Sequence, residues 1–350
     1  MLMVKQAPRW SRTLSFRSLF LTIRHDISSR QIAGKRHLEG VKTIIRSLRL
    51  LSCLLPLGAI SSAEEPAHPL KPMLWKIEGK GLTKPSYLFG TIHLGSGPLA
   101  KLHPAAEKAF QEADVLYTEI PSDNKTQMEA SMQMIRKDQK TLVQSIGEKL
   151  KNQVEAELQA INPALDIRPF QPMKTWVIAV TLPMLKAQLS GEQAMDSTLW
   201  KRAEKAGKKT DSIETVASQL GLFDAFTEED QITLLGETLR IMKQDREAKK
   251  DTMQALIDAY VSGEVEALKK EMDKSIEEMT KGEHKELGQR FYQKLLTDRD
   301  RTMAVTIGEK LTTAPDQCHF FAAGAGHFAG DTSIRTHLEK QGYKITRVEK

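Results

Sequence analysis

Beyond residue 72, the apolar positions first alternate as they do in a β-strand. Residues 73–77 alternate apolar and polar side chains, and residues 86–89 form a second apolar run after a turn at 79–81. Two such runs joined by a glycine-containing turn are typical of a β-hairpin. The pattern therefore predicts a hairpin whose second strand leads directly into Gly-Thr-Ile-His at residues 90–93.

The middle of the chain shows helical spacing instead. Residues 124–161 and 223–279 are rich in polar side chains, and each stretch has apolar residues that recur along one helical face. Those residues are Ile146, Leu150, Val154, Leu158 and Ile161 in the first stretch, and Met253, Leu256, Ile257, Tyr260, Val261, Val265, Leu268 and Met272 in the second. We therefore expect residues 123–290 to form a helix-rich insertion or cap, interrupted by one short strand at 208–215.

The two ends of the chain carry the same kind of unit. In the first, a strand-like run ends in Gly90, His93 follows, and a helix-like segment leads to a second run that ends at Glu119. In the second, His327 follows Gly324 at the same spacing. Two strand-GxxH-helix-strand units predict an α/β fold in which both ends of the chain build one mixed central sheet. Open α/β sheets place their chemistry at the carboxyl ends of the strands, so we expect the two histidines to meet there.

Candidate acidic groups accompany these histidines. Glu119 and Glu214 each end a predicted strand, whereas Asp196 lies on a predicted amphipathic helix and is expected to face solvent. His103 is interpreted as a helix-start residue. An imidazole and a carboxylate at one rim can bind a metal ion or transfer a proton.

The cysteine content limits the chemistry further. Outside the leader only Cys318 remains, which excludes an intramolecular disulfide framework and a thiolate zinc site in that part of the chain. Cys318 begins an apolar strand-like run, so we interpret it as a core residue in preference to a nucleophile. Any metal would need histidine, aspartate and glutamate ligands. The sequence shows no Gly-rich phosphate loop, zincin helix or nucleophile elbow.

These motifs resemble those of the TraB/GumN family, which includes the TIKI metalloproteases. The likeness is carried by residues 90–93, 114–119 and 324–327, and extends over about residues 73–348. The residues Ile-Glu-Thr at 213–215 are similar to the Leu-Glu-Thr motif of the family, which is followed by a glutamine, here Gln219. Arg299 matches the arginine of an Arg-Asn motif, in which Asp300 replaces the asparagine.

The resemblance implies a metal-dependent hydrolase that acts on a peptide or protein. His93, Glu119 and His327 would hold a divalent ion such as Mn²⁺, Co²⁺ or Zn²⁺. Glu214 would serve as general base or fourth ligand, and Arg299 would stabilise developing negative charge. Two alternatives stay open: a metal-independent, esterase-like hydrolase with His93 as general base paired to Glu119, and a non-enzymatic periplasmic binding or regulatory protein whose ligand is haem or a peptide.

The net charge of +6 arises in the first part of the chain. Residues 1–63 hold eleven Lys and Arg against two Asp and Glu, while residues 64–350 hold 40 basic and 43 acidic side chains. The main part of the chain therefore lacks the basic surface that nucleic-acid binding requires. We interpret residues 64–350 as a single domain.

Residues 1–63 resemble a targeting segment. Three cations precede an apolar stretch at 50–60 that is too short to span a bilayer, and small residues follow at 61–63 as in a signal-peptidase site. This pattern predicts a secreted or periplasmic protein whose contact with the membrane is limited to the cleaved leader. The length of the leader indicates a true start near residue 41; a transit peptide in the first forty residues is the alternative.

Overall fold

The computed structural model describes residues 66–189, 193–279 and 281–349. The predicted leader, 1–63, lies outside the described residues. The strands are β1 (Leu74–Glu78), β2 (Ser86–Thr91), β3 (Val115–Thr118), β4 (Lys209–Ser212), β5 (His319–Gly324) and β6 (Lys344–Arg347). They form one six-stranded sheet in the order β4-β3-β5-β2-β1-β6.

The sheet is mixed, and the predicted α/β fold is confirmed. β1 runs antiparallel to both of its neighbours, β2 and β6, while β2, β5, β3 and β4 pair in parallel. Five of the six strands in the described part of the chain therefore point the same way. The predicted hairpin is β1–β2, with Leu74 opposite Phe89. Both strand-GxxH-helix-strand units contribute to this one sheet, as predicted.

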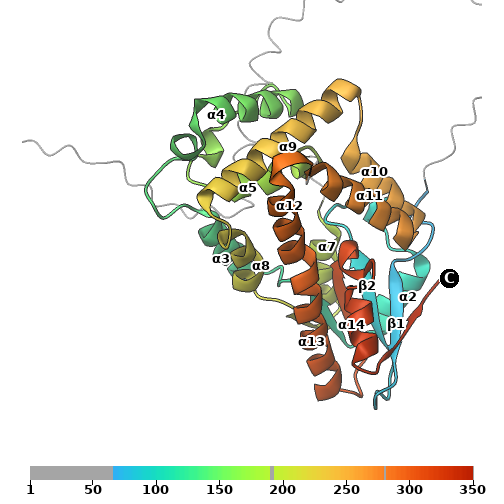
Figure 1. Ribbon diagram of the computed structural model, residues 1–350. Helices are drawn as coiled ribbons and strands as arrows, with labels where there is room; N and C mark the ends of the chain where they lie inside the picture. Colours follow the sequence, from blue (N-terminus) through green and yellow to red (C-terminus); the bar gives the residue numbers. More distant parts are fainter. Residues whose placement is uncertain (1–65, 190–192, 280, 350) are drawn as a thin grey trace, which may run out of the picture.

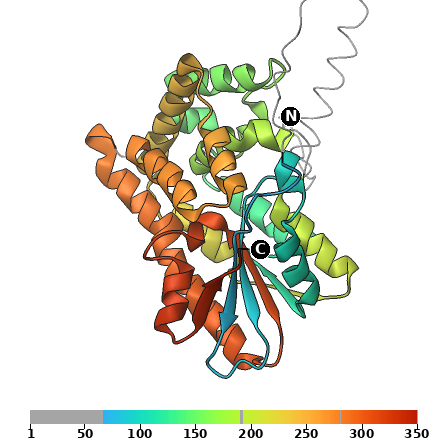
Figure 2. The ribbon, with the colours of Figure 1, turned by 90° about the vertical axis from the view of Figure 1, so that its right-hand side faces the viewer.

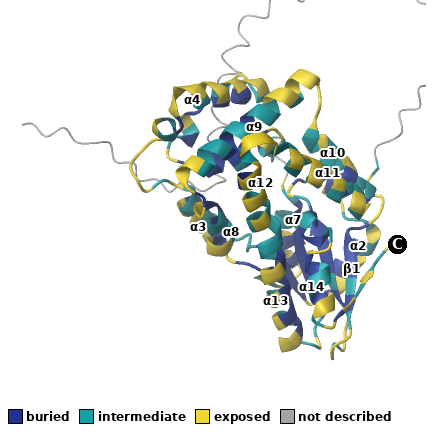
Figure 3. Ribbon diagram, in the orientation of Figure 1, coloured by how far each residue is buried: buried dark blue, intermediate teal, exposed yellow. Residues whose placement is uncertain are grey.

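Helices cover both faces of the sheet, and the side chains of β5, which point alternately to the two faces, contact them. On one face Phe320 packs edge-on against Phe110 of α2 (Pro104–Glu112), with ring centroids 5.7 Å apart. On the other, Phe321 stacks on Tyr117, and Lys310 of α13 (Asp298–Thr313) lies over the Tyr117 ring. α7 (Met195–Lys205) packs against β3 and β4, and α14 (Ile334–Lys340) packs against α13 and β6. Figure 3 shows the central strands buried between these helices, whereas the edge strands β4 and β6 are partly exposed.

The remaining helices form most of the predicted cap. They are α3 (Asn124–Met134), α4 (Leu142–Ile161), α5 (Thr175–Thr181), α6 (Leu185–Leu189), α8 (Val216–Asp224), α9 (Glu228–Ala248), α10 (Thr252–Ser262), α11 (Val265–Met279) and α12 (Lys285–Tyr292). A second hydrophobic core joins α4, α5, α8 and α9, at the opposite end of the molecule from the sheet (Figures 1 and 2). Residues of α7 and α10, including Leu199 and Tyr260, pack into the sheet core instead. None of the helices in the described ranges combines the length and apolar character needed to cross a membrane.

Local signals fix where several of these elements begin. The α2 helix starts with Pro104, and the Nδ1 atom of His103 caps it by accepting a hydrogen bond from the Ala105 N–H (3.2 Å). His103 is therefore the helix-start residue that the sequence predicted. The α8 helix starts with a capping box between Thr215 and Ser218, directly after Glu214.

Candidate functional site

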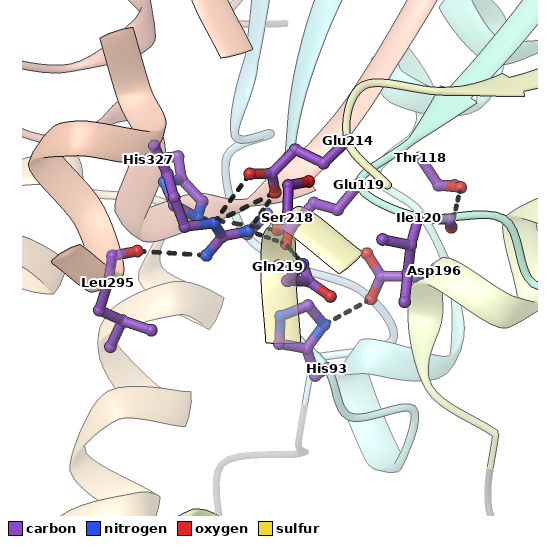
Figure 4. A network of polar contacts seen from close by, with 12 residues as sticks. His93, Thr118, Glu119, Ile120, Asp196, Glu214, Ser218, Gln219, Leu295 and His327 are labelled. Carbon is purple, nitrogen blue, oxygen red and sulfur yellow. Dashed lines mark hydrogen bonds and ion pairs between the residues drawn. The ribbon is translucent and has the colours of Figure 1, made fainter. Parts of the chain in front are cut away.

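Four of the candidate residues follow parallel strands at the same edge of the sheet. His93 comes two residues after β2, Glu119 directly after β3, Glu214 two residues after β4, and His327 lies in the 3-10 turn Ala325–Phe328 after β5. These strands are neighbours in the order β4-β3-β5-β2, so their carboxyl ends bring the four side chains to one rim. Figure 4 shows these side chains gathered in one network of polar contacts.

Both histidine rings approach the same glycine, Gly324. A methyl group on Gly324 would lie 3.6 Å from His93 Nε2 and 3.6 Å from His327 Cδ2, and 3.2 Å from Glu119 Oε1. His327 Nε2 lies 3.9 Å from Glu119 Oε1. The structure thus brings together His93, Glu119 and His327 from three different strands.

An aspartate holds the other nitrogen of each ring. His93 Nδ1 lies 3.0 Å from Asp196, which also accepts a hydrogen bond from the Thr91 hydroxyl (2.7 Å). His327 Nδ1 lies 2.6 Å from Asp300. When the Nδ1 atom donates its proton to a carboxylate, the lone pair of the neutral ring is left on Nε2. His93 Nε2 lies beside Gly324, and His327 Nε2 lies on the side of Glu119 Oε1.

The environments of the two histidines differ. The His93 side chain is 52% exposed, and the Asp196 carboxylate raises the pKa of His93 to about 9. His327 and Asp300 are buried, with only 5% and 4% of their side chains exposed. Burial raises the pKa of Asp300, although the hydrogen bond from His327 acts in the opposite direction.

Glu119 is buried but fully hydrogen-bonded. The Gly324 N–H donates to Oε1 (2.6 Å), while the Gln219 amide and the Arg299 guanidinium both donate to Oε2 (2.6 Å each). Burial alone would raise the pKa of Glu119, but His327, Arg299 and His93 together hold it well below its usual range. The Glu119 carboxylate is therefore ionised and held in one orientation.

Arg299 joins the two glutamates. Its Nε and Nη2 atoms donate to both oxygens of Glu214, at 2.6 to 3.2 Å, while Nη2 also reaches Glu119. The Glu214 N–H donates to the Glu119 carbonyl (2.8 Å), so the backbone fixes the spacing of the two acids. Glu119 and Glu214 raise the pKa of Arg299 against the effect of burial. Both Glu214 oxygens face this guanidinium. Glu214 is therefore placed as an ion-pair partner of Arg299, whereas a general base would need an oxygen free of such a partner.

A π-helical turn, Gln293–Thr297, places Arg299 and Asp300 at the site. It joins α12 to α13 without a break, and its Leu295 carbonyl accepts a hydrogen bond from Arg299 Nη1 (3.2 Å). π-turns insert one residue into a helix and occur frequently at functional sites. Here the turn directs Arg299 toward the two glutamates and Asp300 toward His327.

Two functional contacts were not predicted from the sequence. Asp196 was expected to face solvent, but its side chain is only 15% exposed and contacts His93. Asp300 was noted only as a departure from a family motif, yet it is the partner of His327. Asp196 follows His93 by more than a hundred residues, and no local pattern indicates such a contact. For Asp300, its position next to Arg299 was the only feature of the sequence that pointed to the site.

Cys318 lies away from this site. It directly precedes β5, so it is at the end of the strand opposite to Gly324. Its side chain is buried, and burial raises the pKa of the Cys318 thiol to about 11. This placement agrees with a core residue.

A hollow of about 290 Å³ opens beside the site. Its near wall contains His93, Glu119, Asp196 and Gln219. Its far wall is α3 together with the loop that follows β3. A substrate can therefore reach His93 and Glu119 from this side.

The donor set can be tested against the requirements of a divalent ion. His93 Nε2, the His327 ring and a Glu119 oxygen lie around one point, and an aspartate orients each imidazole, as is usual for metal-bound histidines. Within residues 66–349, leaving aside 190–192 and 280, no group of three or more His, Cys, Asp or Glu side chains has the geometry to hold an ion. The residues fit a divalent ion in ligand type and ring orientation. Both Glu119 oxygens, however, already accept hydrogen bonds, from Gly324, Gln219 and Arg299.

Comparison with known proteins decides the family. The family model described as the TraB/PrgY/gumN family matches residues 73–347. The chain belongs to the TraB/PrgY/gumN family. This match includes all six strands and every residue of the candidate site. No solved structure matches the chain significantly.

Several similar members of the TraB/PrgY/gumN family are named metalloproteases. A metalloprotease TIKI homolog from Nematostella vectensis is 22% identical over 325 residues, which cover 81% of this chain and 68% of that protein. Metalloprotease TIKI1 from Homo sapiens is 25% identical over 343 residues, covering 84% and 67%. The Xenopus tropicalis TIKI1 is 24% identical over 316 residues, covering 79% of this chain and 61% of its own length. The chain thus spans about two thirds or less of the length of these relatives.

Proposed function

We propose that this protein is a metal-dependent hydrolase that cleaves peptides or proteins. The observation that supports the proposal is that His93 Nε2, the His327 ring and Glu119 Oε1 all lie within 4 Å of one point beside Gly324, with an aspartate behind each ring. The names of the TIKI relatives support it. In this proposal His93, His327 and Glu119 hold the ion. A bound divalent ion lowers the pKa of a water ligand and polarises a carbonyl group.

The surrounding residues prepare these ligands. Asp196 and Asp300 keep the Nδ1 atoms as donors, so that Nε2 is the nitrogen left to bind an ion in each ring. Arg299 and Gln219 hold Glu119 as a carboxylate. We assign Glu214 to the orientation of Arg299, in place of the role as general base or fourth ligand that the family resemblance implied, because both of its oxygens face the guanidinium.

Metal titration of the purified protein tests the proposal. Calorimetry with Mn²⁺, Co²⁺ and Zn²⁺ should give stoichiometric binding to the wild type and at least tenfold weaker binding to His93→Ala and His327→Ala, as for lost ligand contacts. His284→Ala, a histidine on a distant exposed turn, is the matched control and should bind as the wild type does. Equal affinity in all four proteins would refute the proposed site.

A metal-free hydrolase is the second candidate, since the contact of His93 with Asp196 is also that of an oriented general base. The raised pKa of His93 opposes a free general base, because a ring with a pKa of about 9 is protonated at neutral pH, and a metal ion would have to displace the same proton on binding. Peptide cleavage that stops on chelation and returns with added Mn²⁺ or Co²⁺ would favour the metal enzyme. Cleavage that survives exhaustive chelation would favour the metal-free one.

We further propose that the protein works outside the cytoplasm, in a secreted or periplasmic form. The proposal depends on residues 1–63, whose composition resembles a signal peptide. Mass spectrometry of the exported protein should find a new N-terminus at residue 64. An intact leader on the mature protein would contradict the proposal.

A further inference from the structure

The hollow beside the site extends well beyond the residues that would hold an ion. It shares His93 and Glu119 with the candidate site and reaches α3, where Ala130 and Met134 line its far end. If the proposed function holds, a peptide with its reacting bond beside Gly324 has a neighbouring side chain at the mouth of this hollow. The inference below rests on that proposed function.

The charges on the walls are already paired. Asp196 is bonded to His93 and Thr91, while Glu119 is bonded to Arg299, Gln219 and the Gly324 N–H. Among the described residues, no lysine or arginine lines the hollow. A charged side chain that moved from water into the hollow would find no partner of opposite sign there, and burying an unpaired charge is costly. The hollow is therefore suited to an uncharged group.

The far wall is largely apolar and leaves considerable room. Ile120, Pro121, Ala130 and Met134 supply its apolar side chains, with the uncharged polar residues Ser122, Thr126 and Gln127 between them, and the volume of the hollow is about 290 Å³. An apolar cavity of about 150 Å³ is large enough to hold benzene. Leucine, methionine or phenylalanine side chains can therefore be accommodated. The unbranched Met134 side chain can adapt to each of them.

We propose that this hollow is the specificity subsite of the hydrolase: it takes an uncharged, apolar side chain next to the cleaved bond, and Ala130 and Met134 of α3 determine the size that it accepts. The subsite discriminates through shape and the absence of an unpaired charge. A deeper or shallower hollow changes the preferred residue without changing the reacting groups.

Cleavage of a peptide library by the full-length protein tests the subsite. Ala130→Phe fills the hollow from α3, so kcat/KM should fall at least tenfold for leucine, methionine or phenylalanine next to the cleaved bond. For glycine or alanine there it should change less than about threefold, a size dependence typical of apolar pockets. Metal affinity should not change. Met132→Phe, on the exposed face of the same helix (63% exposed), is the control and should match the wild type throughout.

A second variant and a binding measurement keep the test decisive. Met134→Ala enlarges the hollow and should shift the preference toward tryptophan. In ligand-observed NMR, N-acetyl-leucine amide should give a signal with the wild type and Met132→Phe that Ala130→Phe abolishes. Equal signals in all three proteins, or stronger binding of the lysine or glutamate amide, would overturn the subsite. If the wild type neither binds metal nor cleaves peptides but still gives the leucine signal, the proposed hydrolase function is refuted. The hollow would still be shown to bind an apolar side chain.

Discussion

Arg299 lies between two acids in a region that water barely reaches. The side chains of Arg299, Glu119 and Glu214 are 11%, 7% and 5% exposed. One guanidinium thus compensates two buried carboxylates, and His327 adds a further partner for Glu119. Buried charges of this kind are costly unless they are paired, so the arrangement depends on every member.

Replacing Arg299 should therefore destabilise the protein strongly. In Arg299→Met the two carboxylates stay buried and lose their common partner, and removal of one member of a buried ion pair typically costs about 3–5 kcal/mol. Urea unfolding followed by circular dichroism measures the free energy of unfolding. The double variant Arg299→Met/Glu214→Gln should recover part of the loss, because one unpaired charge is removed.

Arg301→Met provides the matched control for this measurement. Arg301 is exposed on the same helix, so its replacement should change the free energy of unfolding by no more than about 0.5 kcal/mol. Equal stabilities of the Arg299 and Arg301 variants would show that the ion pairs contribute little.

Gly324 allows a second test at single-residue scale. Its φ of −51° is open to alanine, but the added methyl group would lie 3.2 Å from Glu119 Oε1 and 3.6 Å from His93 Nε2. Gly324→Ala should therefore fold normally, with at least tenfold weaker Mn²⁺ binding in calorimetry, as expected when the supporting shell of a metal site is disturbed. Gly221→Ala, in a helix with open space around it, should bind Mn²⁺ normally. Unchanged binding by Gly324→Ala would place the ion elsewhere.

The site residues that follow strands could be predicted from the sequence, whereas the aspartates that contact the two histidines could not. Glu119 and His327 each follow an apolar run, and the parallel order of the strands then brings them together. Asp196 and Asp300 lie on helices whose rotation depends on tertiary packing. Helical periodicity indicates which face is apolar, but it does not show which polar residue at the margin of that face turns toward a distant histidine. The metal and catalytic roles themselves stay predictions.

At the scale of elements, the strands were predictable and the π-helical turn was not. Alternation and glycine turns indicated β1 and β2, and even the short β4 was expected near its observed position at Lys209–Ser212. The turn at Gln293–Thr297 has no sequence signature, because a single inserted residue leaves the composition of a helix unchanged. Its effect is nevertheless large, since it sets the rotation of α13 relative to α12.

Deleting one residue from this turn should be tolerated, whereas the same deletion in the regular helix should not. A π-turn holds one residue more than an α-helical turn, so removal of Lys294 leaves a regular helix in which Arg299 and the α12 apolar face keep their orientations. Removal of Gln289 from α12 instead rotates these two faces by about 100° relative to one another. We expect Mn²⁺ binding and the free energy of unfolding to stay close to wild type in the first variant and to fall in the second, measured by calorimetry and circular dichroism. Equal effects of the two deletions would refute the role of the turn.

At the scale of the whole molecule, the response to acid depends on the buried groups that titrate first. Burial would raise the pKa of Glu119, but His327, Arg299 and His93 lower it, so the carboxylate loses its charge only in strong acid. Hydrogen bonds from the Cys318 N–H and Lys84 likewise lower the pKa of the exposed Asp114. His319 differs, because burial lowers its pKa below the usual value of 6.5. It is fully buried within β5, with Nε2 2.9 Å from the Ala314 carbonyl and no partner for Nδ1 in the described structure.

His319 should therefore make the fold sensitive to mild acid. A group whose pKa is lower in the folded state binds its proton more tightly when unfolded, so its stabilisation is complete above pH 6.5 and is lost as the pH falls through the folded pKa. His319→Phe keeps an aromatic ring next to Tyr117 and Phe321 and removes the titrating group. Urea unfolding at intervals between pH 7.5 and pH 5 should give a shallower decline for this variant than for wild type, by up to about 1.4 kcal/mol per pH unit. The readout is the slope, because loss of the bond to Ala314 lowers stability at every pH, and parallel slopes would show that another group controls the acid response.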